Sequence, residues 1–191
     1  MPIVGSFAGA SARAYGLGAG GGLALDGFYQ IATTTVGASA VSDITFTGIP
    51  STYKHLQIRG IFISTADVDP QMRFNSDTSA NYSSHALRGS GGSPTAQYLS
   101  GITTNIWFGA QNGTDTTKIM SRVVDILDYA DTNKYKTVRI MNTSANNTTT
   151  ESIELISGNW RSTSAITSIA LTLNGSTWKQ YTSVALYGIT G

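Results

Sequence analysis

The chain contains no cysteine and few charged residues. Lys and Arg together number 12 and Asp and Glu 11, so charged residues make up 12% of the 191 and the net charge is +1. Without cysteine, the chain has neither disulfide bonds nor thiolate metal ligands. Without clustered Lys and Arg, it lacks the basic surface that neutralises phosphates, so we expect no nucleic-acid partner. A surface with so little charge suits a protein packed among neighbours.

Residues that carry acid–base chemistry are also scarce. The two histidines, His55 and His85, have no second ligand at a metal-binding spacing. The only glutamates are Glu151 and Glu154, which a spacing of three puts on opposite faces of a regular strand. A glycosidase-type carboxylate pair stays open as an alternative, but this spacing counts against Glu151 and Glu154 as its members. The Gly-X-Ser-X-Gly turn of serine hydrolases is missing. We therefore expect no enzyme, no cofactor and no metal.

Aspartates form two groups, one of Asp67, Asp69 and Asp77 and one of Asp125, Asp128 and Asp131. Calcium takes six to eight oxygen ligands, and the first group offers two or three without the spacing of a dedicated loop. We interpret these residues as turn formers. The second group would lie along one side of a helix but on both faces of a strand, and we interpret it as a solvated rim.

Long apolar runs are absent as well. No window approaches the 18–20 or so apolar residues of a membrane-spanning helix. The first 22 residues lack the basic region and apolar stretch of a secretory signal. We therefore expect no membrane partner.

Glycine and alanine dominate the first segment, Met1–Gly22, which contains seven Gly and five Ala. Glycine loses much backbone entropy on ordering, so such a segment does not build a core. We predict an extended anchor arm that lies along a partner, with Phe7, Arg13 and Tyr15 as its partner-binding side chains.

Alternating apolar and polar residues predict strands through most of Leu23–Gly191. The predicted strands fall within 28–37, 42–49, 54–64, 71–75, 82–88, 104–111, 118–129, 135–142, 151–161, 165–173 and 181–189. In 151–161 the alternating apolar positions are Ile153 and Leu155, and the phase changes before Trp160. Asn174-Gly175 predicts a hairpin turn between the last two strands.

The segment 118–129 also fits a helical stripe of apolar residues. Its β-branched residues and its β-rich surroundings favour a strand. With turn signals about every dozen residues and no convincing helix, the pattern predicts an all-β fold. We expect a single antiparallel β-sandwich, jelly-roll-like, over Leu23–Gly191, preceded by the extended arm.

Aromatic residues offer an alternative function. Trp107, Trp160 and Trp178, together with nine tyrosines, are suited to a sugar-stacking platform. Trp178 lies in the connector NGSTWKQ and is the best candidate for an exposed glycan-binding residue. Most aromatic residues of a β-sandwich, however, belong to the core.

Two stretches resemble a β-sandwich module of tailed-bacteriophage virion proteins. They are ITFTGIPSTYKHLQIRG (Ile44–Gly60) and AITSIALTLNGSTWKQYTSVALYGI (Ala165–Ile189). The leader SFAGASARAYGL (Ser6–Leu17) is similar to short segments in structural proteins of cyanophage-type phages. The middle, Thr65–Glu151, carries no resemblance.

The resemblance implies a non-enzymatic structural protein located in the virion and docked through its arm. We expect a tail or baseplate appendage of fibre type, with a decoration protein of the capsid as the alternative. A carbohydrate-binding module for the host surface is the alternative from another class. The resemblance further implies a homo-oligomer, often a trimer, that contacts other virion proteins.

Overall fold

The computed structural model describes residues 27–90, 92–98, 103–110, 119–145 and 152–191. Twelve strands and no helix run through these residues, which confirms the predicted all-β class. The strands are β1 (Phe28–Thr35), β2 (Asp43–Phe46), β3 (His55–Phe62), β4 (Pro70–Phe74), β5 (Tyr82–Gly89), β6 (Thr95–Tyr98), β7 (Ile106–Trp107), β8 (Ile119–Leu127), β9 (Lys136–Ala145), β10 (Ser152–Trp160), β11 (Ile169–Leu173) and β12 (Ser183–Ile189). The predicted arm, Met1–Gly22 with Phe7, Arg13 and Tyr15, lies outside the described residues.

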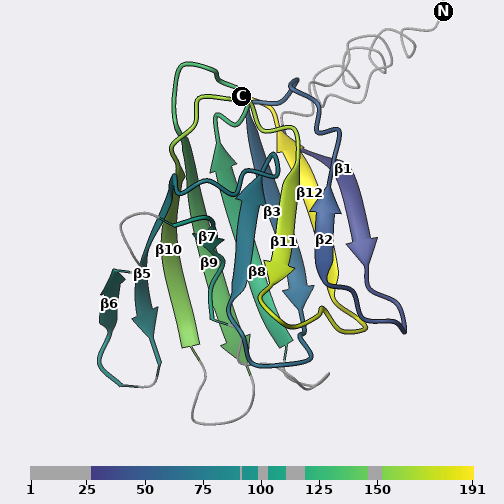
Figure 1. Ribbon diagram of the computed structural model, residues 1–191, viewed down its shortest axis with the longest axis vertical. Helices are drawn as coiled ribbons and strands as arrows, with labels where there is room; N and C mark the ends of the chain where they lie inside the picture. The colour runs from purple at the N-terminus through teal and green to yellow at the C-terminus, as the bar shows by residue number, and fades with distance from the viewer. Residues whose placement is uncertain (1–26, 91, 99–102, 111–118, 146–151) are drawn as a thin grey trace, which may run out of the picture.

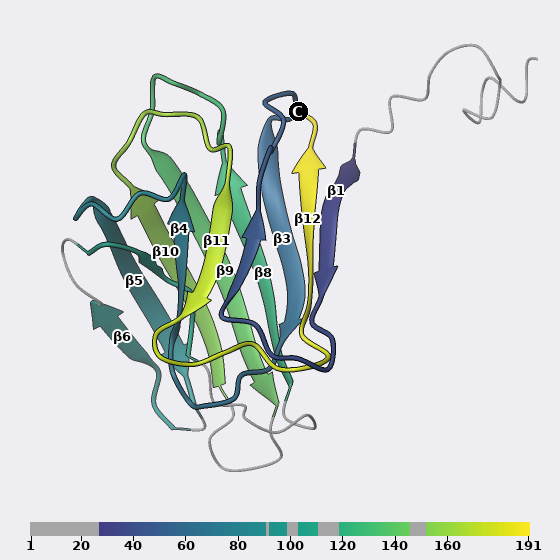
Figure 2. The same cartoon turned by 45° about the vertical axis from the view of Figure 1, so that its right-hand side comes forward.

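In the described part of the chain, the strands form two antiparallel sheets. The large sheet has the order β1-β12-β3-β8-β9-β10-β5-β6, and the small sheet has the order β2-β11-β4-β7. Figures 1 and 2 show the small sheet lying across one face of the large one, as in a β-sandwich. The first strand pairs with the last, and the second pairs with the second to last, so strands from the two ends of the chain lie side by side in each sheet.

This strand order confirms a jelly roll and adds to it. The four strands β1-β12-β3-β8 and the four strands of the small sheet make the eight-stranded double sheet of that fold. Two hairpins extend the large sheet beyond β8. One is β9–β10, inserted between β8 and β11, and the other is β5–β6, inserted between β4 and β7. We call these four strands the extension.

Side-chain alternation explains why the segments become strands. Along β8, Met120, Arg122, Val124 and Ile126 are buried, while the residues that alternate with them face outward. This settles the helix-or-strand alternative for 118–129: the described residues Ile119–Leu127 form a strand. Burial of one apolar face on each strand provides the main stabilisation of the sandwich.

Aromatic rings fill the space between the sheets. The Phe62 ring lies 5.4 Å from the rings of both Phe108 and Trp178, measured between centroids. A second cluster joins Phe74, Tyr82 and Trp160, whose side chains are all buried.

The connection after β11 differs from the prediction. Asn174 and Gly175 do form a turn, with Gly175 at a φ of 75°. The prediction of a hairpin between the flanking strands is wrong, because β11 belongs to the small sheet and β12 to the large one. The turn instead starts a crossing between sheets, and on the way Trp178 forms bridges with Val41 and Ser64.

Candidate interaction surface

The large sheet has one face turned away from the small sheet, which we call the outer face. In the extension, this face carries three exposed apolar side chains in one row. Leu155 of β10 lies directly opposite Leu87 of β5 on one side and Met141 of β9 on the other. Their exposed fractions are 54%, 51% and 45%, and Ile153, two residues before Leu155, is 52% exposed. We call these four residues the apolar patch.

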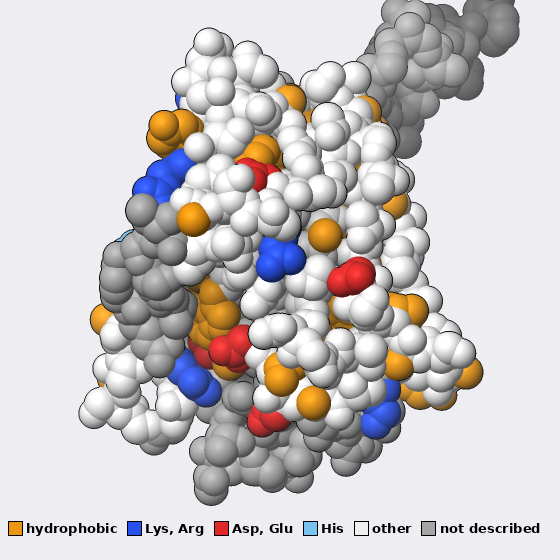
Figure 3. All heavy atoms as spheres, viewed as in Figure 1, with side chains coloured by type: hydrophobic (Ala, Val, Ile, Leu, Met, Phe, Trp, Pro, Cys, Tyr) orange, Lys and Arg blue, Asp and Glu red, His pale blue; other side chains and the backbone are white. Residues whose placement is uncertain are grey.

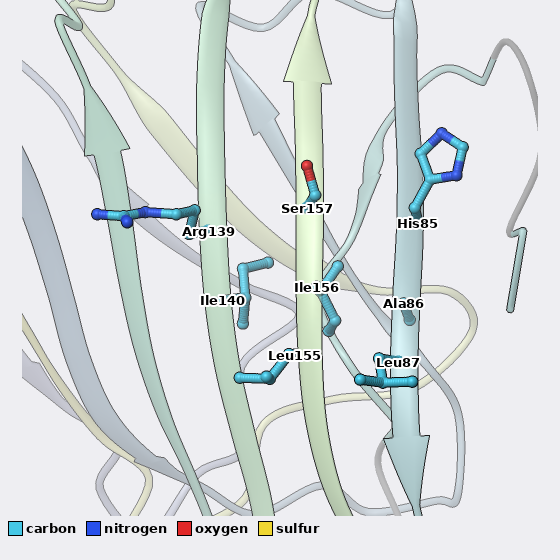
Figure 4. A pocket seen from close by; sticks show the side chains of 8 residues that line it. All are labelled: His85, Ala86, Leu87, Arg139, Ile140, Leu155, Ile156 and Ser157. Carbon is cyan, nitrogen blue, oxygen red and sulfur yellow. The ribbon is translucent and has the colours of Figure 1, made fainter. Parts of the chain in front are cut away.

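Two shallow hollows lie along the apolar patch, and both are lined by Leu87 and Leu155. The larger, of about 470 Å³, also reaches His85, Arg139 and Ser157. Figure 4 shows Leu155 and Leu87 at one end of this hollow, with Arg139 and His85 extending to opposite sides. The smaller, of about 220 Å³, continues toward Ile153 and Pro94. The hollows give the apolar patch surface relief.

The charged groups on the outer face belong to one chain of contacts. Arg139 contacts Asp125 at 3.5 Å, between Nη2 and Oδ2. Asp125 Oδ1 also accepts a hydrogen bond of 2.6 Å from Gln57 Nε2, and Gln57 Oε1 in turn accepts one from Arg59. The Arg59 guanidinium lies 4.7 Å above the Phe28 ring. The Arg139–Asp125 pair beside the apolar patch is therefore neutral overall, whereas Arg59 on β3 adds a positive charge farther away.

The face of the small sheet that points away from the large sheet is mainly polar. Figure 3 looks onto that side and shows isolated charged side chains among largely uncharged polar surface. On β2, for example, the exposed residues are Asp43 and Thr45, while Ile44 and Phe46 point into the core. A polar face of this kind is ordinary for a solvated sheet.

Beneath the apolar patch, a row of polar side chains crosses the inner face of the extension. Arg122, Asn142, Glu154 and Arg88 lie opposite one another on β8, β9, β10 and β5. Glu154 Oε2 accepts hydrogen bonds from Asn142 Nδ2 at 2.8 Å and from the Ala110 backbone at 2.9 Å. Arg88 Nε lies 3.2 Å from Glu154 Oε1. We call these four side chains the buried ladder.

Arg122 carries a positive charge and lies on β8, at the end of the buried ladder opposite Arg88. Its Nη2 donates a 2.8 Å hydrogen bond to the Ala110 carbonyl, and its guanidinium lies 4.9 Å above the Phe62 ring. Burial lowers the pKa of Arg122 to about 9, and the negative charge of Glu154 opposes this shift. Arg122 is therefore protonated at neutral pH. Through the bonds of Arg122 and Glu154 to the Ala110 backbone, the buried ladder links the extension to the segment that follows β7.

Sequence reasoning reversed the two faces of β10. Ile153 and Leu155 alternate with Glu154, and this alternation predicts buried Ile153 and Leu155. In the structure they are exposed, whereas Glu154 is buried together with Ile156 and Trp160. One sequence signal could have revealed the buried face. The change of phase before Trp160 indicates a strand that is apolar on both faces.

The prediction of an exposed Trp178 is also wrong. Its side chain is fully buried against Phe62, and its Nε1 donates a 3.0 Å hydrogen bond to the Leu171 carbonyl. A buried indole offers no ring face to a sugar. Trp178 therefore serves the core in this structure.

The histidines and glutamates considered for chemistry do not come together. His55 lies on β3 and His85 on β5, with β8, β9 and β10 between them. His55 Nδ1 accepts a 3.0 Å hydrogen bond from the Asp128 backbone. Glu151 lies outside the described residues, so its position relative to Glu154 stays untested.

Aspartates mostly stabilise loops. Asp128 and Asp131 both contact Lys134. Asp77 accepts hydrogen bonds from Asn81 and from Trp160 Nε1, the latter at 2.7 Å. Among the residues that the structure describes, no three His, Asp or Glu side chains are placed to hold a metal ion.

No family model matches the chain, and no curated protein matches it either. Within the described ranges, no helix is long and apolar enough to cross a membrane. The apolar patch, with the neutral Arg139–Asp125 pair beside it and the buried ladder beneath it, is therefore the candidate functional surface.

Proposed function

We propose that the chain is a non-enzymatic structural subunit of a tailed-bacteriophage particle, which assembles through the outer face of its large sheet. The observation that carries this proposal is the extension. It widens a jelly roll by four strands and places four exposed apolar side chains on three of them. Contiguous apolar surface of this kind is typical of protein–protein contact sites.

The two stretches that resemble phage virion modules support the proposal through their positions. The first, Ile44–Gly60, covers most of β2 and β3, and the second, Ala165–Ile189, covers β11 and β12. Although more than a hundred residues separate them in sequence, β2 pairs with β11 and β3 pairs with β12. The resemblance therefore falls on one contiguous part of the jelly roll.

A role in assembly also fits the distribution of charge. The chain has a net charge of +1 with few charged residues, so copies packed at high density repel one another little. On the outer face Arg139 and Asp125 are already paired within the chain, and burying paired charges costs less than burying isolated ones. Fold alone assigns no function, and the proposal therefore rests on this surface and on the resemblance.

Within the particle, we propose a tail or baseplate appendage, held additionally by the arm with Phe7, Arg13 and Tyr15. The described chain begins next to β1, the edge strand of the large sheet farthest from β6. A capsid decoration protein is the alternative position.

The test is quantitative mass spectrometry of purified particles of the phage whose genome encodes this chain. Particles are purified through a density gradient, and the chain is counted against isotope-labelled standard peptides. We expect it to sediment with the particles at a constant copy number. A low copy number supports the appendage, and a far higher one supports the decoration role. Absence of the chain from washed, infectious particles would falsify the proposal.

A further inference from the structure

We infer that the outer face of the large sheet binds the same face of a second copy of this chain, forming a face-to-face dimer. This inference rests on the proposed use of that face in assembly and names its partner. The contact is isologous, which means that the same residues take part on both sides.

The exposed apolar side chains are concentrated on this one face. In the described part of the chain, ten large hydrophobic side chains are exposed, and seven of them belong to the outer face. They are Phe28, Ile61, Leu87, Ile119, Met141, Ile153 and Leu155. Scattered exposed hydrophobics are normal, but this many on one sheet face indicate a surface that is covered in the assembled state.

The row at the centre of the apolar patch is suited to pairing with itself. Leu155 on β10 has Leu87 on one side and Met141 on the other, each directly opposite in register. The two-fold axis would lie between the two copies and run parallel to β10. It brings Leu155 against the partner's Leu155, and Leu87 against the partner's Met141. Leu and Met differ little in volume, so each apolar side chain meets one of similar size.

The area is sufficient for a stable dimer. Neighbouring strands lie about 4.8 Å apart, and residues on one face of a strand about 6.7 Å apart. The strands that lie symmetrically about this axis are β8, β9, β10, β5 and β6. With four rows of outward residues on the first four and two on the short β6, they cover about 580 Å² in projection. Side-chain relief increases the accessible area beyond this value, and a standard interface buries about 800 Å² per partner.

The charges favour a second copy over an acidic or basic partner. Arg139 and Asp125 form a pair of opposite signs beside the apolar patch, and Gln57 links Asp125 to Arg59. A nucleic acid or an acidic peptide requires a surplus of free positive charge. A second copy brings the same Arg139–Asp125 pair, and Arg59 lies on β3, outside the strands that face one another about this axis.

A face-to-face contact of this kind closes at two copies. The trimer that the phage resemblance implies therefore needs a separate contact elsewhere on the chain. The inferred pairing is compatible with such an assembly as the link between two neighbouring subunits.

The experiment compares the full-length protein with Leu155→Arg and with the matched control Thr45→Arg. Thr45 is exposed on β2, on the opposite side of the sandwich. Analytical ultracentrifugation from low to high micromolar concentration measures the mass, and circular dichroism checks that each variant is folded. We expect a dimer whose dissociation constant rises by about 30-fold or more in Leu155→Arg, as for a central interface residue, and stays unchanged in Thr45→Arg.

Because the chain has no cysteine, a single introduced thiol gives an independent readout. Leu155→Cys is expected to form a disulfide-linked dimer under mild oxidation, whereas Thr45→Cys at the same concentration is not. A wild-type protein that is monomeric throughout the concentration range overturns the inference. A dimer that Leu155→Arg leaves intact overturns it as well.

The outcome is separable from that of the particle experiment. If the chain is present on particles but Leu155→Cys does not cross-link and the protein is monomeric, the dimer is wrong and the structural role stands. If the dimer forms but the chain is absent from particles, the dimer stands and the phage role is wrong.

Discussion

The side-chain amide of Asn142 donates a 2.8 Å hydrogen bond to the carboxylate of Glu154, deep between the two sheets. Both side chains are fully buried, and Arg122 lies directly opposite Asn142 on the next strand. A buried carboxylate persists only where donors and positive charges compensate it. The charge of Glu154 is therefore stabilised by Asn142 and Arg122, and the buried charge of Arg122 is stabilised by Glu154.

Glu154→Gln is expected to destabilise the protein by about 3–5 kcal/mol, because it removes the stronger of the two carboxylate charges, Glu154 and Asp69, that compensate the buried Arg122. Urea unfolding followed by fluorescence measures the change. Asp125→Asn is the matched control, since it breaks a carboxylate–arginine pair on the exposed outer face and should cost about 1 kcal/mol or less. Equal losses for the two variants would show that the buried ladder adds no special stability.

Asp77 is expected to make stability depend on acid pH. Burial acts to raise the pKa of this carboxyl, but hydrogen bonds from Asn81, Ser79 and Trp160 outweigh it and lower the pKa to about 2. The unfolded chain has the ordinary value of 3.8, so the stabilisation is present above pH 4 and is lost as the pH falls toward 2.

The measurement for Asp77 is the free energy of unfolding at several pH values, for the wild type and Asp77→Asn. We expect the wild type to be more stable at neutral pH and the difference to shrink between pH 4 and pH 2. A difference that stays constant over this range contradicts the assignment.

Trp178→Ala is expected to cost about 3–5 kcal/mol, because it opens a large cavity beside Phe62 and leaves the Leu171 carbonyl without its donor. Thermal and urea unfolding measure the loss. Tyr135→Ala removes an exposed aromatic residue and should change stability by no more than about 0.5 kcal/mol. A fully stable Trp178→Ala protein would be incompatible with the buried position of this indole.

Asn75 holds the segment that leads into β11. Its φ is 52°, its Oδ1 accepts bonds from the Thr167 and Ser168 backbone, and its Nδ2 donates to the Ala165 carbonyl at 2.8 Å. Asn75→Ala is expected to cost about 2–4 kcal/mol, since it removes these bonds and keeps the left-handed backbone.

Ser76→Gly provides the contrast to Asn75→Ala. Ser76 has a φ of 55° and an exposed side chain, so glycine should relieve backbone strain and change stability by about +1 kcal/mol at most. Unfolding curves of both variants test the assignment. If Asn75→Ala is as stable as Ser76→Gly, the side-chain bonds of Asn75 contribute little.

Local alternation was enough to predict most of the strands, although not β6, which lies where no strand was predicted. Strands such as β8, β9 and β12 could be located because residues two apart share a face and one face is apolar. The all-β class and the sandwich followed, since such strands are stable only when their apolar faces pack together. These are short-range properties, and they depend on neighbouring residues alone.

Alternation alone could not predict which face of a strand is buried. In β10 both faces carry apolar residues, and only the position of β10 next to β9 and β5 places Glu154 inside and Leu155 outside. The compensation of Glu154 by Arg122 and Asn142 comes from two other strands. The apolar patch and the buried ladder were therefore invisible in the sequence.

The sequence by itself determined the strands, the scarcity of charge and the absence of cysteine. The tertiary structure decided that Trp178 is buried, that the Asn174-Gly175 turn leads from one sheet to the other, and that four extra strands widen the jelly roll. The reason is physical: strand pairing and sheet packing join residues that are far apart in the chain, and their energies depend on the complete arrangement rather than on any local pattern.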